Sequence, residues 1–211
     1  MANQKHHHLK NKTIYILRHG ETDFNKKGLV QGRGVNASLN EKGRLQASQV
    51  CDYLKGDNID HIYTSSLKRT EETVASLIAH GIQFTSLEGF DEISWGNQEG
   101  VQASIEDKAV YADTLAEWRK GNLDLSVGGG ESPNQVMKRQ KEAMEIVLAS
   151  EHDNILICMH GRALRILLCW MLNYPLNFMD GFPHQNCGYY KLKSDGNSFT
   201  IISSNKDPYS T

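Results

Sequence analysis

The chain has 211 residues of mixed composition, a length typical of one domain with a sizeable buried core. Its formal net charge is −2, so it lacks the basic field of a nucleic-acid-binding protein, and we expect no nucleic-acid partner. The sequence contains neither an apolar run of roughly 18 residues nor the apolar core of a signal peptide, and we therefore expect no membrane partner.

The four cysteines form no Cys-x-x-Cys pair and no zinc-type spacing, so we interpret them as small hydrophobic residues. Unpaired thiols are typical of reducing compartments, and we expect a cytoplasmic protein. Residues 1–12 are polar and include His6-His7-His8, which predicts a disordered tail. We expect a single domain over residues 13–205.

The first predicted strand, Thr13–Leu17, is apolar and leads directly into Arg18-His19-Gly20. A Gly-rich polar loop over residues 24–40 follows it. Asn40 is then typical of a helix N-cap, and the apolar stripe from Ala47 to Leu54 predicts a helix lying on a sheet.

A second strand is predicted at Ile59–Thr64, and we interpret Ser65-Ser66 as the cap of the helix that follows. This places Arg69 in the first turn of that helix, just beyond the end of a strand. A third strand is expected at Phe84–Leu87, and a helix is expected from about Ile105 to Trp118.

The second half of the chain continues the alternation of helices and strands. Ser132-Pro133-Asn134-Gln135 has the pattern of a capping box with Pro at the first helical position, and predicts a helix to about Ser150. Residues 155–159 form the most continuous apolar strand and end at His160-Gly161. An amphipathic helix over 164–172 and a hairpin around Asp195-Gly196 follow. The pattern predicts an α/β fold, a three-layer α/β/α sandwich with a mostly parallel central sheet.

Polar side chains follow three of these predicted strands. Arg18 and His19 end the first strand, Arg69 follows the second, and His160 ends the strand at 155–159. If these strands are parallel neighbours, their ends open on one crevice, where α/β sheets place ligands. Guanidinium groups match phosphate oxygens two at a time, and a neutral imidazole nitrogen can attack phosphorus.

A carboxyl group beside such a site can supply a proton to a leaving oxygen. Glu92 lies on the loop between these segments, with Asp91 next to it as a rival acid. The backbone N–H of Gly161, near a helix start, is a further natural contact for an anion.

Seven segments together resemble, in order, the motifs of the histidine phosphatase superfamily, in its phosphoglycerate mutase-like branch with the Arg-His-Gly motif. The resemblance covers roughly residues 13–192, and the segments that carry it are Leu17–Thr22 with Asn25, Val30–Arg33, Leu39–Gly43, Thr64–Thr70, Glu92–Gly100, Gly129–Ser132 and Met159–Arg165. The resemblance implies the phosphoglycerate mutase-like fold. In its register Glu92 is favoured over Asp91 as the acid.

The resemblance also implies a role for each site residue. His19 is the expected nucleophile and forms a phosphohistidine, and Glu92 is the expected general acid and then base. The phosphoryl oxygens are expected to be held by Arg18, Arg69 and His160. The substrate-binding residues implied by the same motifs are Asn25, Gln31, Gly32 and Gly161. No metal and no cofactor are implied.

Arg162 follows His160-Gly161 and leaves two interpretations open. It is either a solvated charge at a helix start, or it reaches a second anionic group on the substrate. Arg165, one turn further on, is interpreted as structural. We expect residues 101–127 to cap the crevice, as lids that set specificity do.

The sequence therefore predicts a metal-independent phosphatase that hydrolyses a small phosphorylated metabolite through a phosphohistidine. A cofactor-dependent phosphoglycerate mutase is the alternative. The resemblance disfavours it, because such mutases carry a longer segment after the acid and a Glu-Arg-x-Tyr-Gly motif, whereas here only about 30 residues separate Glu92–Gly96 from the Gly-rich segment before Ser132. A non-catalytic phospholigand-binding protein is less favoured, because such a protein should have lost one of these side chains. The sequence leaves open whether the chain forms a homodimer.

Overall fold

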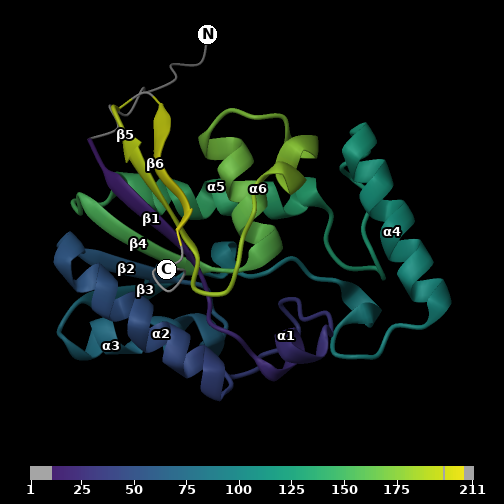
Figure 1. The fold of residues 1–211 in the computed structure, drawn as a ribbon. Coiled ribbons are helices and arrows are strands. Elements are labelled where there is room, and N and C mark those ends of the chain that lie inside the picture. Colours follow the sequence, from purple (N-terminus) through teal and green to yellow (C-terminus); the bar gives the residue numbers. More distant parts are fainter. Residues whose placement is uncertain (1–10, 197, 207–211) are drawn as a thin grey trace, which may run out of the picture.

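The computed structural model describes residues 11–196 and 198–206. Its centre is a six-stranded sheet in the order β3-β2-β4-β1-β5-β6 (Figure 1). The strands are β1 (Thr13–Arg18), β2 (His61–Thr64), β3 (Gln83–Ser86), β4 (Asn154–Met159), β5 (Tyr189–Ser194) and β6 (Phe199–Lys206). The first four are parallel to one another, and the β5–β6 hairpin joins β1 antiparallel. The predicted, mostly parallel sheet is confirmed.

Helices cover both faces of this sheet. The long helices are α2 (Glu41–Leu54), α3 (Lys68–Ala79), α4 (Ile105–Lys120), α5 (Pro133–Ala149) and α6 (Gly161–Met171). In Figure 1, α2 and α3 lie on one side of the sheet and α5 and α6 on the other, which is the predicted three-layer sandwich.

Alternation along β1 explains why two cores form, because successive side chains of a strand point to opposite faces. Tyr15 and Leu17 pack in one cluster with apolar residues of α2 and α3. Ile14 and Ile16 pack in the other cluster with apolar residues of α5 and α6. Each central strand is thus buried on both sides, as its continuous apolar sequence indicates.

Two of the predicted helix starts are confirmed and one is wrong. The side chain of Asn40 accepts from the backbone N–H of Gly43, and Ser132 forms a capping box with Gln135. However, α3 begins at Lys68 with Leu67 at its N-cap, so Ser65-Ser66 is not the cap. The Ser65 hydroxyl accepts from the Leu67 N–H and is also within hydrogen-bond distance of His160, which ties it to the site instead.

The helix α4 differs from the others because it stands apart from the sheet (Figure 1). Ile105 at its start is 87% exposed, while Trp118 near its end is buried. The helix expected from about Ile105 to Trp118 is confirmed, although it has only Trp118 fully buried. The shorter elements are α1 (Asp23–Lys27), η1 (Lys55–Asp57), η2 (Glu88–Phe90), η3 (Gly96–Gln98) and η4 (Leu176–Gly181).

The predicted tail over residues 1–12 is wrong at its last residue. Lys12 is buried, and its Nζ donates to the backbone carbonyls of Ser150 and His152. The rest of that tail up to residue 10, with His6-His7-His8, lies outside the described residues. Within the described ranges, no helix is both long enough and apolar enough to span a bilayer.

Candidate active site

The carboxyl ends of β1, β4 and β2 lie side by side at one edge of the sheet. Arg18 of β1 is paired with Met159 of β4, and Thr64 of β2 with Cys158. The residues that follow these strands are consequently brought together. The ring centroids of His19 and His160 are 5.1 Å apart.

A cavity of about 260 Å³ opens at this edge. Seven of the predicted site residues line it: Arg18, His19, Asn25, Gln31, Glu92, Gly161 and Arg162. Its other lining residues are Leu29, Val30, Trp95, Tyr111, Arg165 and His184. Arg69 and His160 are fully buried behind this lining. The structure thus gathers the predicted residues around one small cavity.

The hydrogen bond of His19 defines its tautomer. Its Nδ1 lies 2.7 Å from the backbone oxygen of Gly20. Since a carbonyl oxygen only accepts, Nδ1 carries the proton and Nε2 keeps a free lone pair. Burial lowers the pKa of this imidazole well below 6.5, and the charges of Arg69 and Arg18 lower it further. His19 is therefore a neutral imidazole at neutral pH.

His160 has the opposite tautomer. Arg69 Nε, which can only donate, lies 3.2 Å from His160 Nδ1, so this nitrogen is the acceptor. The proton is then on Nε2, which donates to the Ser65 hydroxyl at 2.8 Å. Burial also lowers the pKa of His160 well below 6.5, with Arg69 as the next cause.

Arg69 is held by the backbone as well as by His160. Its Nη1 donates to the Val35 carbonyl at 2.6 Å, and its Nη2 donates to the Gly32 carbonyl at 3.2 Å. Burial lowers its pKa to about 10, so the guanidinium remains charged. Each terminal nitrogen carries a second N–H beyond the bond it already makes.

The structure adds His184, which the sequence analysis did not single out. Arg18 Nη1 donates to His184 Nδ1 at 3.0 Å. Burial and the nearby charge of Arg18 lower the pKa of His184 to about 3, so its neutral ring can accept this bond. A Cβ on Gly161 would come within 2.7 Å of this ring, which explains why glycine is needed there. The sequence indicates His184 as a site residue only by the presence of a histidine in a short polar loop.

Glu92 is held at the start of α6. One carboxylate oxygen accepts from the Ile93 and Ala163 N–H groups, both at 2.9 Å, and the other accepts from the Arg162 N–H at 3.1 Å. A helix N-terminus is a favourable place for this charge. The rival acid Asp91 instead accepts from the backbone and hydroxyl of Ser66 and from Arg33.

The predicted substrate-binding residues differ in how they face the cavity. Gln31 Nε2 donates to the Thr22 hydroxyl, whereas its buried Oε1 has no partner among the described residues. Asn25 Oδ1 accepts from Thr22 and, at 3.3 Å, from Asn186 Nδ2, a second residue that the sequence analysis missed. Gly32 lies behind the cavity, where a Cβ would collide with Glu99.

The interpretation of Arg162 as a solvated charge is wrong, because its side chain is only 9% exposed. Its Nη1 donates to Asp180 Oδ1 at 2.5 Å, and its guanidinium lies 5.7 Å from the centroid of the Trp118 ring. Arg165, interpreted as structural, also lines the cavity.

No group of three or more His, Cys, Asp or Glu side chains in the described part of the chain is placed to hold a metal ion.

Comparisons with known proteins agree with this arrangement. The model of the histidine phosphatase superfamily (branch 1) matches residues 14–207. A broad-specificity phosphatase of Saccharomyces cerevisiae is 29% identical over 206 residues, covering 92% of this chain and 80% of that protein. A Cronobacter sakazakii protein named "Probable phosphoglycerate mutase GpmB" is 34% identical over 188 residues, covering 85% and 83%.

The fold is shared with solved structures. A mycobacterial glucosyl-3-phosphoglycerate phosphatase, solved with VO3, superposes with a TM-score of 0.82 at 24% identity, covering 92% of this chain and 98% of that one. The predicted fold is confirmed by this likeness. Because the family model spans nearly all of the described residues, the chain belongs to the histidine phosphatase superfamily, branch 1.

Proposed function

We propose that this protein is a metal-independent phosphatase that hydrolyses a small phosphorylated metabolite through a phosphohistidine at His19. The observation that carries the proposal is the state of that imidazole. Its proton is fixed on Nδ1 by the Gly20 carbonyl, and its pKa is well below 6.5. A free lone pair on Nε2 at neutral pH is what attack on phosphorus requires.

The reaction has two steps. In the first, His19 Nε2 forms a bond to phosphorus while the bond from phosphorus to the ester oxygen breaks, and Glu92 in its protonated form gives its proton to that oxygen. In the second, the Glu92 carboxylate takes a proton from water as the water oxygen attacks phosphorus. The P–N bond breaks, inorganic phosphate leaves, and His19 recovers its lone pair.

Cationic and N–H groups surround the place of the transferred phosphoryl group. Arg18 Nε is buried without a partner among the described residues, and a phosphoryl oxygen would satisfy it. Arg69 contributes its second N–H groups and its charge. His160 contributes its imidazole, which Arg69 and Ser65 hold beside the ring of His19. The Asn25 amide and the Gly161 N–H complete the set of donors.

We also propose that residues 13–205 form one domain and that residues 101–127 are its cap. Tyr111 of α4 lines the cavity, and Trp118 of the same helix contacts Arg162, which supports a covering role for this segment. We also propose a cytoplasmic location, because the four cysteines, all among the described residues, are buried and form no disulfide bond.

The test is an assay in EDTA against p-nitrophenyl phosphate and a panel of phosphorylated metabolites, comparing wild-type protein with His19→Ala. His80→Ala is the matched control, because His80 is exposed at the end of α3 and bonds the Ser76 carbonyl of its own helix. We expect turnover in EDTA that is lost in His19→Ala and kept in His80→Ala. Activity that survives His19→Ala would contradict the proposal.

Phosphoglycerate mutase activity is the second candidate, because relatives such as the Cronobacter sakazakii protein carry that name. Interconversion of 2- and 3-phosphoglycerate, primed with 2,3-bisphosphoglycerate, measures it directly. Mutase turnover that exceeds hydrolysis of every monoester would replace the phosphatase proposal.

A further inference from the structure

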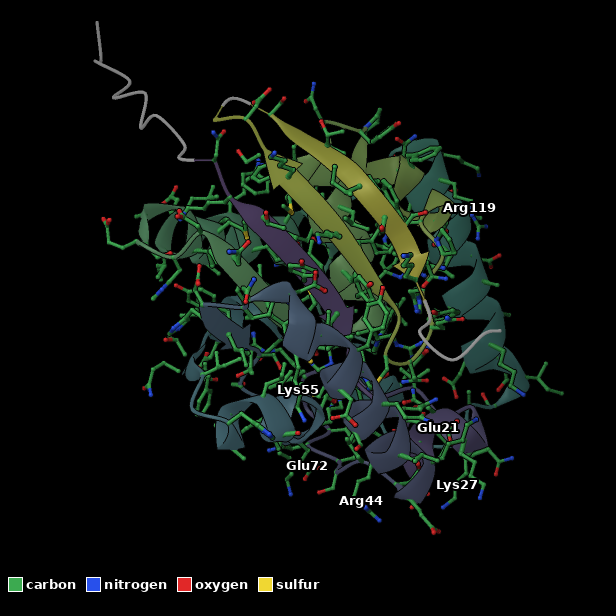
Figure 2. All side chains as sticks on the ribbon, turned by 60° about the vertical axis from the view of Figure 1, so that its left-hand side comes forward. Glu21, Lys27, Arg44, Lys55, Glu72 and Arg119 are labelled. Carbon is green, nitrogen blue, oxygen red and sulfur yellow. The ribbon has the colours of Figure 1, made fainter. Side chains whose placement is uncertain are left out.

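Three guanidinium groups share one carboxylate beside the cavity. Asp180 of η4 accepts at Oδ1 from Arg162 Nη1, at 2.5 Å, and from Arg165 Nη1, at 3.1 Å. Its Oδ2 lies 3.3 Å from Arg119 Nε, and Arg119 lies on α4 (Figure 2). A single carboxylate therefore neutralises only one of three positive charges.

The three arginines differ in where they lie. The side chain of Arg119 is 58% exposed and is not part of the cavity lining, whereas the side chains of Arg162 and Arg165 are 9% and 21% exposed and both line it. Together with Arg18, they place three guanidinium groups on the cavity lining, and Glu92 supplies its one carboxylate among the described residues. Burying several positive charges together is costly in free energy, and a negatively charged ligand in the cavity would offset that cost.

The excess charge affects the groups around it. Burial lowers the pKa of Arg165, and the neighbouring charge of Arg162 is the next cause. The pKa of His184, across the same cavity, is lowered by burial and then by Arg18, Arg165 and Arg162. These shifts agree with the geometry: the positive charges of Arg162 and Arg165 exceed the one negative charge of Asp180 that they share.

The position of Glu92 indicates which part of a substrate meets these arginines. Its carboxylate is bound to the backbone N–H of Arg162, at the first turn of α6. In the proposed reaction Glu92 protonates the leaving oxygen, so the leaving group extends along this turn. Arg162 and Arg165 are three residues apart and therefore lie on the same face of the helix.

We propose that Arg162 and Arg165 bind a carboxylate on the leaving group, so that the preferred substrates are small phosphomonoesters that carry a carboxylate. This inference rests on the proposed phosphatase function and narrows its substrate class. The contacts of Asp180 show that one carboxylate oxygen can lie between the two Nη1 atoms. Both guanidiniums have further N–H groups for a second carboxylate.

A matched pair of substrates isolates the carboxylate. O-Phosphoserine and phosphoethanolamine share the phosphate, the ester carbon and the amine, and differ only by the carboxylate. We expect the wild-type protein to favour O-phosphoserine about tenfold or more in kcat/KM, the effect of one charge-assisted contact. Arg162→Gln is expected to bring this ratio close to one, and Arg162→Lys to restore part of it.

Arg119→Gln is the matched control. Arg119 also pairs with Asp180, but it lies outside the cavity. We therefore expect this variant to keep the wild-type ratio of kcat/KM between O-phosphoserine and phosphoethanolamine. Equal use of both substrates by the wild-type protein would overturn the carboxylate site and leave the phosphatase function standing. This comparison needs no variant and holds even if Arg162→Gln does not fold.

Two other results are equally informative. If Arg162→Gln lowers kcat/KM for both substrates by the same factor, Arg162 supports the cavity wall and the carboxylate site is overturned. If the wild-type protein hydrolyses no monoester at all, including p-nitrophenyl phosphate, the proposed function itself is overturned, and this inference with it.

Discussion

At the scale of single residues, His184 is the partner that orients Arg18. His184→Ala leaves Arg18 Nη1 without its acceptor and opens space beside Gly161. We expect kcat/KM for p-nitrophenyl phosphate to fall about tenfold, because a guanidinium that must grip a phosphoryl group loses its fixed orientation. Steady-state kinetics across this variant and His184→Gln measure the effect. Since Gln retains an acceptor, it should recover part of the loss, and equal rates in all three proteins would contradict this role.

The sequence analysis identified the residues of the candidate site that belong to motifs. It did not identify those that reach the site only through packing of the folded chain. Arg18, His19 and His160 follow strands, so a strand pattern alone places them at one edge of the sheet. Asp180 lies in the short helix η4, and His184 and Asn186 lie in the irregular segment that follows it, where no periodicity indicates which way a side chain points. The burial of Arg162 was equally hidden, because it depends on Trp118 from a helix distant in sequence.

At the scale of elements, the capping boxes of α5 and α4 offer a comparison between a helix in the core and one outside it. Ser132→Ala removes the cap of α5, whose apolar face is buried, and should lower the free energy of unfolding by about 1 kcal/mol in urea titrations. Ser104→Ala removes the same contact from α4, where Trp118 is the buried residue. We expect it to speed hydrogen exchange in α4 while leaving the global unfolding midpoint nearly unchanged. The opposite pattern would mean that α4 unfolds with the core.

The helices that pack on the sheet were predicted from the sequence. A helix that packs on a sheet must present one apolar face, so α2, α5 and α6 show their period directly in the sequence. The helix α4 obeys no such constraint, because it packs through Trp118 and leaves Ile105 in solvent. Its place beside the cavity depends on the course of the loops on either side of it, which no local sequence pattern predicts.

At the scale of the whole molecule, buried neutral histidines couple stability to pH. Burial lowers the pKa of His19 and His160 well below 6.5 and that of His184 to about 3. The unfolded chain therefore binds more protons than the folded protein as the pH falls below about 6.5. The contribution of these histidines to the free energy of unfolding is fully present above that pH. It declines as the pH falls toward 3, by at most about 1.4 kcal/mol per pH unit for each histidine. Urea unfolding at pH 7 and pH 5 should show a clear loss at pH 5, and His184→Gln should lessen it. Unchanged stability between these pH values would contradict the neutral state of the three rings.

In Figure 2, Glu21, Lys27 and Arg44 lie at the end of the molecule around α1 and α2, and Arg119 lies apart from them on α4. Glu21 is paired there with Lys42 at 2.9 Å. The overall charge of −2 therefore conceals local groups of opposite sign, including the cationic cavity. Net charge is a property of the whole chain, and it carries no information about a site of three arginines.

The strand order also affects how the chain is made. The strand β1 leaves the ribosome first, yet its two neighbours in the sheet are β4 and β5, and β4 does not begin until residue 154. Throughout most of translation β1 therefore has both edges unpaired, which is the condition in which strands associate with the wrong partner. Folding must wait for contacts between distant parts of the chain, and such folding is slow. A truncated product that ends before β4 would carry the His19 loop without the strand that positions it. Premature termination before β4 should thus yield a chain that aggregates and lacks catalytic activity.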